Sequence, residues 1–362
     1  LYLQAVIVKN EERMKFMQHV VIWGGAGMTG GELLRIAATH PAMKIAGVVS
    51  RSHAGRPLWH LHPPLRSFYG DRRFLSPEEA RNTETDLVFL ALPHGASLEM
   101  LPFYVGKNIP LVDLSADLRL RSSEEYARWY EREHPFPELL EKAVYGLPEL
   151  HRKEIARSSL VSGVGCNATA GVLGLYPLAR EDLVEEVDME MRVGSSEGGA
   201  SPSRGSHHPY RRGVLRVVSF FEHRHLGEIL QETGLEPART RMTLTAAEMV
   251  RGVQMFARVR LVRKMKESEI WKIFRSCWRD EPFIDFCPSR PGHLRFPDPR
   301  MVLGSNRVQI GFALAEDGRT LLVGSALDNL MKGAAGTAVQ AANVMFGLPE
   351  TSGLEMMSVY PA

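Results

Sequence analysis

Residues 161–170, VSGVGCNATA, place a cysteine where its thiol is suited to act as a nucleophile. Cys166 follows a glycine and opens an apolar segment with the pattern of a helix. A thiol in the first helical turn faces the positive end of the helix dipole and free backbone N–H groups, which lower the thiol pKa. Those groups and the Asn167 amide are also suited to hold a developing oxyanion. We expect a reactive thiol; a small buried cysteine packed against glycines is the alternative.

A nucleophilic thiol needs a proton carrier, and two histidine pairs are candidates. His223 and His225 in FEHRHLGEI alternate, so on an extended segment both rings point the same way. His207 and His208 are adjacent and lie among arginines. Neither pair has a third carboxylate or cysteine ligand at the spacing typical of zinc, so we expect no metal site.

A glycine cluster lies upstream of the cysteine. Gly24, Gly27 and Gly30 form G-x-x-G-x-x-G between a short β-rich run and a helical pattern within residues 19–41. Glycine lets the backbone turn tightly and approach a pyrophosphate, whose charge is met by the N-terminus of the following helix. The pattern therefore predicts dinucleotide binding; a tight strand–helix turn without a ligand is the alternative.

The residues after the next apolar run indicate which dinucleotide is bound. An NAD-binding protein places Asp or Glu about 20 residues beyond the loop to bind the ribose 2′-hydroxyl. This chain has Ser50, Arg51 and Ser52 in that region. An arginine flanked by hydroxyls suits a 2′-phosphate, so we expect NADP(H) rather than NAD; an ordinary solvated charge at Arg51 is the alternative.

These side chains are expected to sit on an α/β fold. Short continuous apolar runs at 44–50, 85–93 and 109–115 are separated by helix-sized segments, which predicts parallel strands in a Rossmann-type, doubly wound sheet. After Cys166, longer alternating runs predict an α+β domain with a mainly antiparallel sheet. Those runs are residues 187–193, 214–220, 241–246 and 253–262. A hairpin turning at 316–318 and helices at 266–283 and 330–347 complete the prediction.

Composition narrows the class of protein. The chain has 362 residues, enough for two domains with sizeable cores, and its formal net charge of +2 is too mild to indicate nucleic-acid binding. It contains no uninterrupted apolar run of the ~18–20 residues that a membrane span needs. The three cysteines form no disulfide pattern, so Cys277 and Cys287 are interpreted as structural and a reducing, cytoplasmic location is expected.

Seven motifs together resemble the N-acetyl-γ-glutamyl-phosphate reductase family, from about residue 19 to 350. They are GGAGMTGGEL (24–33), FLALPHGAS (89–97), VDLSADLRL (112–120), YGLPEL (145–150), GCNATA (165–170), HRHLGEI (223–229) and ALDNLMKGAAG (326–336). The resemblance implies an enzyme that reduces an acyl phosphate to an aldehyde with NADPH and releases phosphate. It implies Cys166 as nucleophile, His225 as acid/base and Arg119 as a ligand of the acyl phosphate. The implied cofactor contacts are Gly24, Ala26, Gly27, Met28, Thr29, Gly30, Ser50, Arg51, Ser52 and Asn329.

The chain departs from the commoner family pattern at two places, and at both it is similar to one branch of the family. The motif around the thiol is VGCNAT instead of PGCYAT, and a longer segment, SSEGGASPSRGSHHPYRRG, occupies residues 195–213. Both resemble the branch whose glutamyl or 2-aminoadipyl phosphate is tethered to an acidic amino-group carrier protein in lysine and arginine synthesis. The expected substrate contacts are Arg119, Asn167, Ser196, Arg204, His207, His208 and Arg211.

The positive charge of that segment is suited to steer an acidic carrier towards the site. Arg212 and Arg216 extend the same basic stretch. A solvated loop, or arginines that bind only the substrate's own phosphate and carboxylate, is the alternative. A free N-acetyl-γ-glutamyl phosphate is therefore the second candidate substrate.

The domain division expected from these patterns has four parts. Residues 1–18 form an N-terminal extension, with Met14 or Met17 as alternative starts, and 19–162 form the NADP-binding domain. Residues 163–329 form the catalytic and oligomerisation domain, and 330–362 a C-terminal helix that returns to the first domain. The resemblance implies a homodimer or homotetramer. A non-catalytic NADP-binding sensor or scaffold, and a dehydrogenase for aspartate semialdehyde or a triose phosphate, are further alternatives.

Overall fold

The computed structural model of the chain describes residues 17–287 and 294–360. Contacts divide it into two compact units. The first unit contains the chain through Leu118, together with 142–163 and 338–355, and the second contains 119–141, 164–337 and the residues from Met356. Most of the predicted N-terminal extension, residues 1–16, lies outside the described residues. Within the described part of the chain, no helix is long and apolar enough to cross a membrane.

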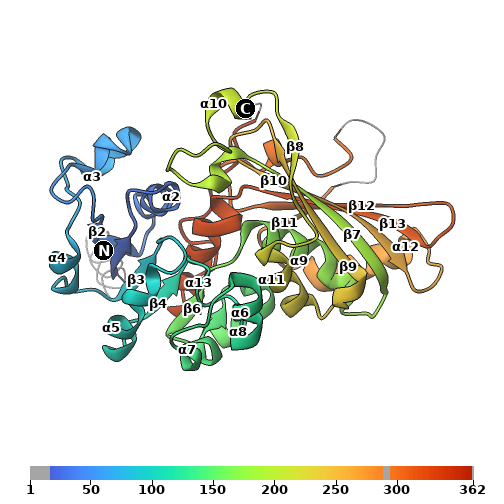
Figure 1. Cartoon of the computed structure of the whole chain (residues 1–362), viewed down its shortest axis with the longest axis horizontal. Helices are drawn as coiled ribbons and strands as arrows, with labels where there is room; N and C mark the ends of the chain where they lie inside the picture. The colour runs from blue at the N-terminus through green and yellow to red at the C-terminus, as the bar shows by residue number, and fades with distance from the viewer. Residues whose placement is uncertain (1–16, 288–293, 361–362) are drawn as a thin grey trace, which may run out of the picture. The chain divides into compact units, whose positions relative to one another are not determined.

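The first unit is built on a six-stranded sheet in which every described pair of neighbours is parallel, in the order β2-β1-β3-β4-β6-β5 (Figure 1). The strands are β1 (Gln18–Trp23), β2 (Met43–Val49), β3 (Leu87–Leu90), β4 (Leu111–Asp113), β5 (Val144–Tyr145) and β6 (Leu160–Ser162). Their helices are α2 (Met28–Ala37), α3 (Arg66–Tyr69), α4 (Pro77–Arg81), α5 (Leu101–Gly106), and α8 (Pro148–Ile155). The predicted Rossmann-type sheet is confirmed: apart from the first two residues of β1, strands β1, β3 and β4 are fully buried, as parallel strands covered on both faces require, and all their buried residues except Asp113 are apolar.

The C-terminal helix α13 (Gly336–Met345) belongs largely to the first unit. Buried polar side chains tie it there: His40 Nε2 and Asn343 Oδ1 are 3.0 Å apart, and Gln340 donates to Glu149 at 3.1 Å. The preceding segment, Met331–Ala335, is a short π-helix, and its contacts assign it to the second unit. The segment predicted as one helix over 330–347 is therefore divided between the units.

The second unit is built on a seven-stranded mixed sheet in the order β11-β12-β13-β10-β7-β9-β8 (Figure 1). The strands are β7 (Val184–Val193), β8 (Leu215–Phe220), β9 (Thr240–Ala247), β10 (Val253–Leu261), β11 (Ile284–Phe286), β12 (Val308–Leu314) and β13 (Thr320–Leu327). Four of the described neighbouring pairs are antiparallel, including the predicted β12–β13 hairpin, and β7–β9 and β11–β12 are parallel. The prediction of a mainly antiparallel sheet is confirmed.

Helix α9 (Cys166–Ala179) lies in the core of the second unit and packs on strands β10 and β13. It is held by side chains from distant parts of the unit: Ser325 donates to the carbonyl of Ala170 at 2.6 Å, and the Trp278 indole donates to the carbonyl of Leu173 at 3.0 Å. A methyl group at Gly174 would lie 2.4 Å from Met255 Cε, so the absence of a side chain there allows the close packing of helix on sheet. The start of α9 is therefore fixed from several sides.

The remaining helices of the second unit surround this core. They are α6 (Ser123–Tyr130), α10 (His208–Arg211), α11 (Arg224–Thr233) and α12 (Glu267–Trp278), while α7 (Pro137–Lys142) spans the division between units. Residues 119–141 were expected in the first domain, but their contacts place them in the second. The reason is charge pairing, since Arg121 forms an ion pair of 2.9 Å with Glu232 on α11.

Candidate active site

The predicted dinucleotide loop joins β1 to α2. Gly24 has φ +74°, and a methyl group there would lie 2.0 Å from the carbonyl oxygen of Ala91. A methyl group at Gly30 would lie 2.5 Å from the carbonyl oxygen of Gly24. Gly27 is the N-cap of α2 and has no side chain with which to cap it, so the first N–H groups of the helix remain available. Both glycine positions and the open helix start fit a bound pyrophosphate.

The residues predicted to select NADP follow β2. Arg51 is exposed and forms an ion pair with Glu99. Ser50 and Ser52 both approach Nδ1 of His53, at 3.3 and 2.9 Å. The two hydroxyls thus lie close together at His53 Nδ1, and the adjacent arginine is engaged by Glu99, which would compete with a 2′-phosphate for the guanidinium.

Cys166 is the first residue of α9, as predicted, and its side chain is buried. Two glycines make space for it. A methyl group at Gly333 would lie 2.6 Å from Cys166 Cβ, and one at Gly165 would lie 2.6 Å from Cδ2 of His225. A side chain at Gly333 would therefore displace Cys166, and one at Gly165 would displace the imidazole of His225.

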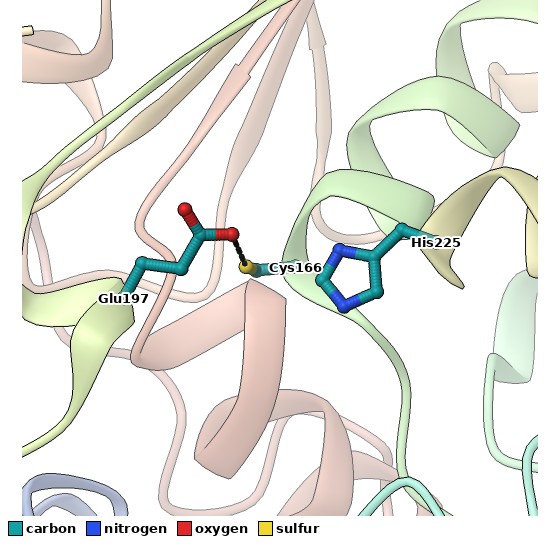
Figure 2. A group of neighbouring side chains, drawn as sticks. All are labelled: Cys166, Glu197 and His225. Atoms are coloured by element: carbon teal, nitrogen blue, oxygen red, sulfur yellow. Dashed lines mark hydrogen bonds between the residues drawn. The ribbon is translucent and has the colours of Figure 1, made fainter. Parts of the chain in front are cut away.

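A carboxylate that the sequence analysis did not single out lies against the sulfur. Glu197, in the short helix η4 (Ser195–Gly198), accepts a hydrogen bond from Cys166 Sγ at 3.3 Å, as Figure 2 shows. Its Oε1 also accepts from Nδ2 of Asn167. One of the two side-chain N–H groups of Asn167 is thus engaged by Glu197, and the proposed oxyanion contact of this amide stays a prediction.

The charge state predicted for Cys166 is wrong in this structure. Burial raises the pKa of the Cys166 thiol well above its usual value, and the negative charge and hydrogen bond of Glu197 raise it further. The guanidinium of Arg119 and the backbone N–H of Asn167 act in the opposite direction but do not compensate. Helix-dipole stabilisation is smaller than the desolvation cost of an anion at this depth. The resting sulfur is a thiol.

His225 occupies the first turn of α11, with His223 as the N-cap. Nδ1 of His223 accepts the backbone N–H of His225 at 3.3 Å, and the two ring centroids are 4.7 Å apart. The two histidines were expected on an extended segment, but they lie at the start of a helix. His223 caps the helix with extended backbone angles, and His225 is already helical. The sulfur of Cys166 lies between the His225 ring and Glu197 (Figure 2).

Arg119 and Glu228 form a buried charged pair behind the imidazole. Arg119 Nη1 is 3.2 Å from Glu228 Oε1, and Glu228 Oε2 accepts the backbone N–H of Gly165 at 2.8 Å. The same Arg119 nitrogen is 3.4 Å from Nε2 of His225. Since a guanidinium only donates, Nε2 is assigned as the acceptor and the imidazole proton lies on Nδ1.

The imidazole is held neutral. Burial lowers the pKa of His225 well below its usual value, and the positive charges of Arg119 and Arg224, together with His223 when it is protonated, lower it further. Nδ1 of His225 is buried and has no hydrogen-bond partner among the described residues. A neutral imidazole with a free N–H is therefore available to a substrate oxygen or to a proton acceptor.

One atom each of Cys166, Glu197 and His225 lie within 4.8 Å of one another, a set of ligand types that a zinc ion is able to use. The sequence analysis expected no metal, on the spacing of histidines and cysteines. That expectation stays a prediction, because Glu197 supplies the kind of third ligand that the spacing argument did not find. The same three groups are also sufficient for proton transfer without a metal.

The other predicted contacts occupy two places. Ser196 and Asn329 are buried together: Asn329 Nδ2 donates to Ser196 Oγ at 2.9 Å, and its Oδ1 accepts from Gly252 N at 2.8 Å. The basic residues lie apart from this pair, on the exposed segment around α10. Those residues are Arg204, His207, His208 and Arg211, of which only Arg211 is half-buried. Arg211 donates to the carbonyl of Val193 at 2.6 Å, and its charge partly offsets the burial that raises the pKa of Glu197.

Sequence reasoning missed Glu197 and gave no role to Glu228. Glu197 interrupts a glycine- and serine-rich segment, in which no periodicity orients a side chain. Glu228 stands three residues after His225, the spacing that puts two side chains on one helix face, so the sequence did carry a signal for it.

Comparison with known proteins shows which families and relatives the chain is similar to. Residues 19–158 match the family model described as semialdehyde dehydrogenase, NAD binding domain, and 166–329 match semialdehyde dehydrogenase, dimerisation domain. A Saccharolobus solfataricus protein named LysW-L-2-aminoadipate/LysW-L-glutamate phosphate reductase is 42% identical over 354 residues, covering 96% of this chain and 100% of the relative. The protein of that name from Sulfurisphaera tokodaii is 42% identical over 351 residues, covering 96% and 100%.

Solved structures show the same fold at low identity. Aspartate semialdehyde dehydrogenase II from Vibrio cholerae matches with a TM-score of 0.69 at 14% identity, covering 91% of this chain and 98% of that chain. The Candida albicans aspartate semialdehyde dehydrogenase, whose structure is described as being with NADP, matches with a TM-score of 0.66 at 13% identity, covering 91% and 98%. The motif resemblance is confirmed by the sequence relatives: the chain belongs to the semialdehyde dehydrogenase family and is an NAD(P)-dependent oxidoreductase.

Proposed function

We propose that this enzyme reduces an acyl phosphate to a semialdehyde with NADPH and releases phosphate, through a thioester on Cys166. The proposed substrate is a 2-aminoadipyl or glutamyl phosphate attached to a carrier protein, as the names of the relatives say of those proteins. The observation that carries the proposal is the thiol at the buried start of α9, between the imidazole of His225 and the carboxylate of Glu197 (Figure 2). Such a trio is what nucleophilic attack and proton transfer need.

The proposed reaction uses the sulfur as a temporary acyl carrier. Cys166 attacks the acyl-phosphate carbonyl and loses its proton, the bond from carbon to the phosphate oxygen breaks, and a thioester forms. Hydride transfer, supplied by the bound nicotinamide, converts the thioester to a thiohemiacetal. The carbon–sulfur bond then breaks, which releases the semialdehyde and restores the thiol after proton uptake. His225, with its proton on Nδ1, donates to the substrate carbonyl oxygen as negative charge develops there.

Arg119 has two candidate roles in this reaction. The resemblance assigns it to the acyl phosphate, and its charge lies close enough to Cys166 to lower the thiol pKa. Its Nη1 is also paired with Glu228 and faces Nε2 of His225. We propose that this pairing fixes the imidazole tautomer, and that the positive charge of the guanidinium attracts the acyl phosphate.

The residues predicted to hold the dinucleotide fit it. The clashes that a side chain would make at Gly24 and Gly30 show that the backbone is closely packed there, and α2 starts without a side-chain cap at Gly27. We propose that the pyrophosphate lies against these N–H groups and that Arg51, with Ser50 and Ser52, binds the 2′-phosphate. Asn329 stays a predicted cofactor contact, although its amide is already bonded to Ser196 and Gly252.

The carrier is proposed to dock on the basic segment that follows η4. Arg204, His207, His208 and Arg212 are exposed, and Arg216 is exposed on β8. An acidic partner would gain in association rate from such a cluster, and the gain should fall as salt is raised. If only a free N-acetyl-γ-glutamyl phosphate is a substrate, salt should leave kcat/KM nearly unchanged, because a small anion lacks the acidic surface of a carrier.

The second unit is also the proposed site of self-association. Strand β8 forms one edge of its sheet and exposes apolar side chains. Those at least half exposed are Leu215, Phe220 and the following Phe221, with Val217 and Val218 somewhat less so. An exposed apolar edge strand is a template for pairing with another chain. We propose that a second copy covers β8, which agrees with the dimerisation domain named by the family model.

Cys166→Ser tests the proposed function directly. The variant should bind NADPH as wild type does but lose turnover by at least about a thousandfold, because a hydroxyl is a far weaker nucleophile than a thiol at neutral pH. Reduction is assayed in parallel with free N-acetylglutamyl phosphate and with carrier-bound glutamyl and 2-aminoadipyl phosphates. A serine variant that keeps full activity would overturn the proposal. Rapid, substrate-protected alkylation of Cys166 by iodoacetamide above its pKa separates the enzyme from a sensor that merely binds NADP.

A further inference from the structure

The reacting sulfur has two neighbours that are able to take its proton, and only one of them is hydrogen-bonded to it. Cys166 Sγ donates to Glu197 Oε1 at 3.3 Å, whereas the His225 ring lies on the opposite side of the sulfur (Figure 2). Nε2 of that ring faces a guanidinium nitrogen of Arg119 at 3.4 Å, so its lone pair is engaged by that donor. The geometry favours the carboxylate as the proton acceptor.

The charges around the two groups favour the same choice. Burial and the positive charges of Arg119 and Arg224 oppose a further proton on the His225 ring. Burial raises the pKa of Glu197, and the hydrogen bonds from Cys166 and Asn167 and the charges of Arg224 and Arg211 act in the opposite direction. Glu197 Oε1 accepts hydrogen bonds from both Cys166 Sγ and Asn167 Nδ2. In the resting enzyme the carboxylate is thus an acceptor and the imidazole is a neutral donor.

We propose that Glu197 is the general base of the acylation step, and that His225 acts as the hydrogen-bond donor to the carbonyl. The inference rests on the proposed function, in which Cys166 is the nucleophile. As the sulfur–carbon bond forms, the sulfur–hydrogen bond breaks and the proton moves to Oε1 of Glu197. When the carbon–oxygen bond to phosphate breaks, that proton becomes available to the leaving group, which departs as hydrogen phosphate. The carboxylate is regenerated and no other co-reactant is required.

If Glu197 takes the proton while the sulfur attacks, Cys166 is able to act as a nucleophile although it rests as a thiol. A thiolate and a carboxylate 3.3 Å apart would repel each other in a site shielded from water, so the pair holds a single proton. That proton rests on sulfur until bond formation to carbon makes the sulfur more acidic. Glu197 then receives it over one hydrogen bond, with no preformed thiolate exposed to oxidation.

The test uses Glu197→Gln, which keeps the shape of the side chain and removes its charge. Two quantities are measured on EDTA-treated full-length enzyme: the rate of phosphate release from the best of the three acyl phosphates without NADPH, and the pH midpoint of iodoacetamide alkylation of Cys166. Acylation should slow about 10²–10⁴-fold, the range for loss of a general base. The alkylation midpoint should move to lower pH, because a neighbouring negative charge has been removed.

These opposite changes are the signature of a base, since a merely structural disturbance of the thiol would not make it both easier to ionise and slower to acylate. Glu197→Asp, which retains a carboxylate, should recover part of the acylation rate. Glu222→Gln is the matched control: it removes an exposed carboxylate near His223 and should change neither quantity.

Wild-type acylation by Glu197→Gln would overturn the role of Glu197 while leaving Cys166 as the nucleophile. A fall in acylation without a shift of the alkylation midpoint would equally overturn it, since the carboxylate would then not act on the thiol. Turnover by Cys166→Ser would instead overturn the proposed function on which the inference rests. Melting temperatures of all variants establish that each is folded.

Discussion

Helices α2 and α9 both follow a glycine N-cap, and they illustrate how differently a helix N-terminus can be used. Helix α2 begins after Gly27 in the first unit, and α9 begins after Gly165 in the second. Met28, the first residue of α2, is 38% exposed, whereas Cys166, the first residue of α9, is 9% exposed. The first start is open to an incoming anion. The second is enclosed and already has carboxylates as neighbours.

The difference shows that a helix dipole does not by itself decide the charge of the group it faces. At α9, Glu228 accepts the N–H of Gly165 and Glu197 accepts from the thiol, so negative charge has already been supplied by the protein. A second anion on sulfur would lose solvation and gain repulsion, which outweighs the fraction of a charge that the helix offers. At α2, the corresponding position is left for the ligand.

Methyl groups at the two helix starts should separate their functions most strongly. At Gly165 the new carbon would lie 2.5 Å from Glu228 Oε1 and 2.6 Å from Cδ2 of His225. Gly165→Ala should therefore lower kcat about a hundredfold, because a displacement of about 1 Å misplaces the imidazole. Its affinity for NADPH should be retained. Steady-state kinetics and NADPH titration, followed by fluorescence, measure the two effects.

The counterpart at the other helix start is Gly30→Ala, whose methyl group would lie 2.5 Å from the carbonyl oxygen of Gly24. NADPH binding should weaken at least tenfold, about 1.4 kcal/mol, while alkylation of Cys166 proceeds as in wild type. Gly106→Ala is the control, since a methyl group there meets nothing within 4 Å. If Gly165→Ala weakened NADPH binding as much as Gly30→Ala does, the two helix starts would not have separate roles.

The enclosed helix start should also make stability depend on pH. Burial, and then the charge of Arg224, lower the pKa of His223 to about 4 from a usual value of 6.5. The unfolded chain therefore takes up this proton at higher pH than the native protein does. The contribution of His223 is fully present above pH 6.5 and is lost as the pH falls from 6.5 towards 4.

His223→Ser keeps a helix-capping oxygen and removes the titration. Between pH 7 and pH 4.5, the free energy of unfolding should fall more for wild type than for the variant, by at most about 3 kcal/mol. This limit comes from the roughly two pH units between 6.5 and 4.5, at about 1.36 kcal/mol each. Urea denaturation at the two pH values measures the difference. His225, whose pKa is lowered in the same direction, remains in both proteins. Identical pH dependence of the two proteins would show that His223 is not held neutral by its surroundings.

The fold was predictable from local patterns, and the position of the thiol was predictable for the same reason. The apolar run at 85–93 contains β3, and the turn at 316–318 joins β12 to β13, because burial on both faces and hairpin chemistry leave marks over a few residues. The resting charge of Cys166 was not predictable. It depends on Glu197, which is 31 residues away in the chain and lies in a segment without periodicity.

Long-range pairing also explains the other differences. In sequence, residues 119–141 lie between strands β4 and β5 of the first sheet, but the pairs Arg119–Glu228 and Arg121–Glu232 hold them to α11. Nothing in the local sequence of either arginine names its partner. His225 was found from its sequence motif, but its tautomer follows only from the nearby guanidinium.

The smallest effect is expected in the first unit, at the exposed ion pair of Arg51 and Glu99. Arg51→Ala should raise KM for NADPH about tenfold, about 1.4 kcal/mol, and leave KM for NADH unchanged, because only NADPH carries a 2′-phosphate. Glu99→Gln should act in the opposite direction, since Glu99 is the ion-pair partner that competes for the guanidinium. The ratio of kcat/KM for the two cofactors measures both. Equal changes for NADPH and NADH would mean that Arg51 supports the loop and does not read the phosphate. Because this pair is well exposed, unlike the enclosed charges at α9, raising the salt concentration should reduce both effects.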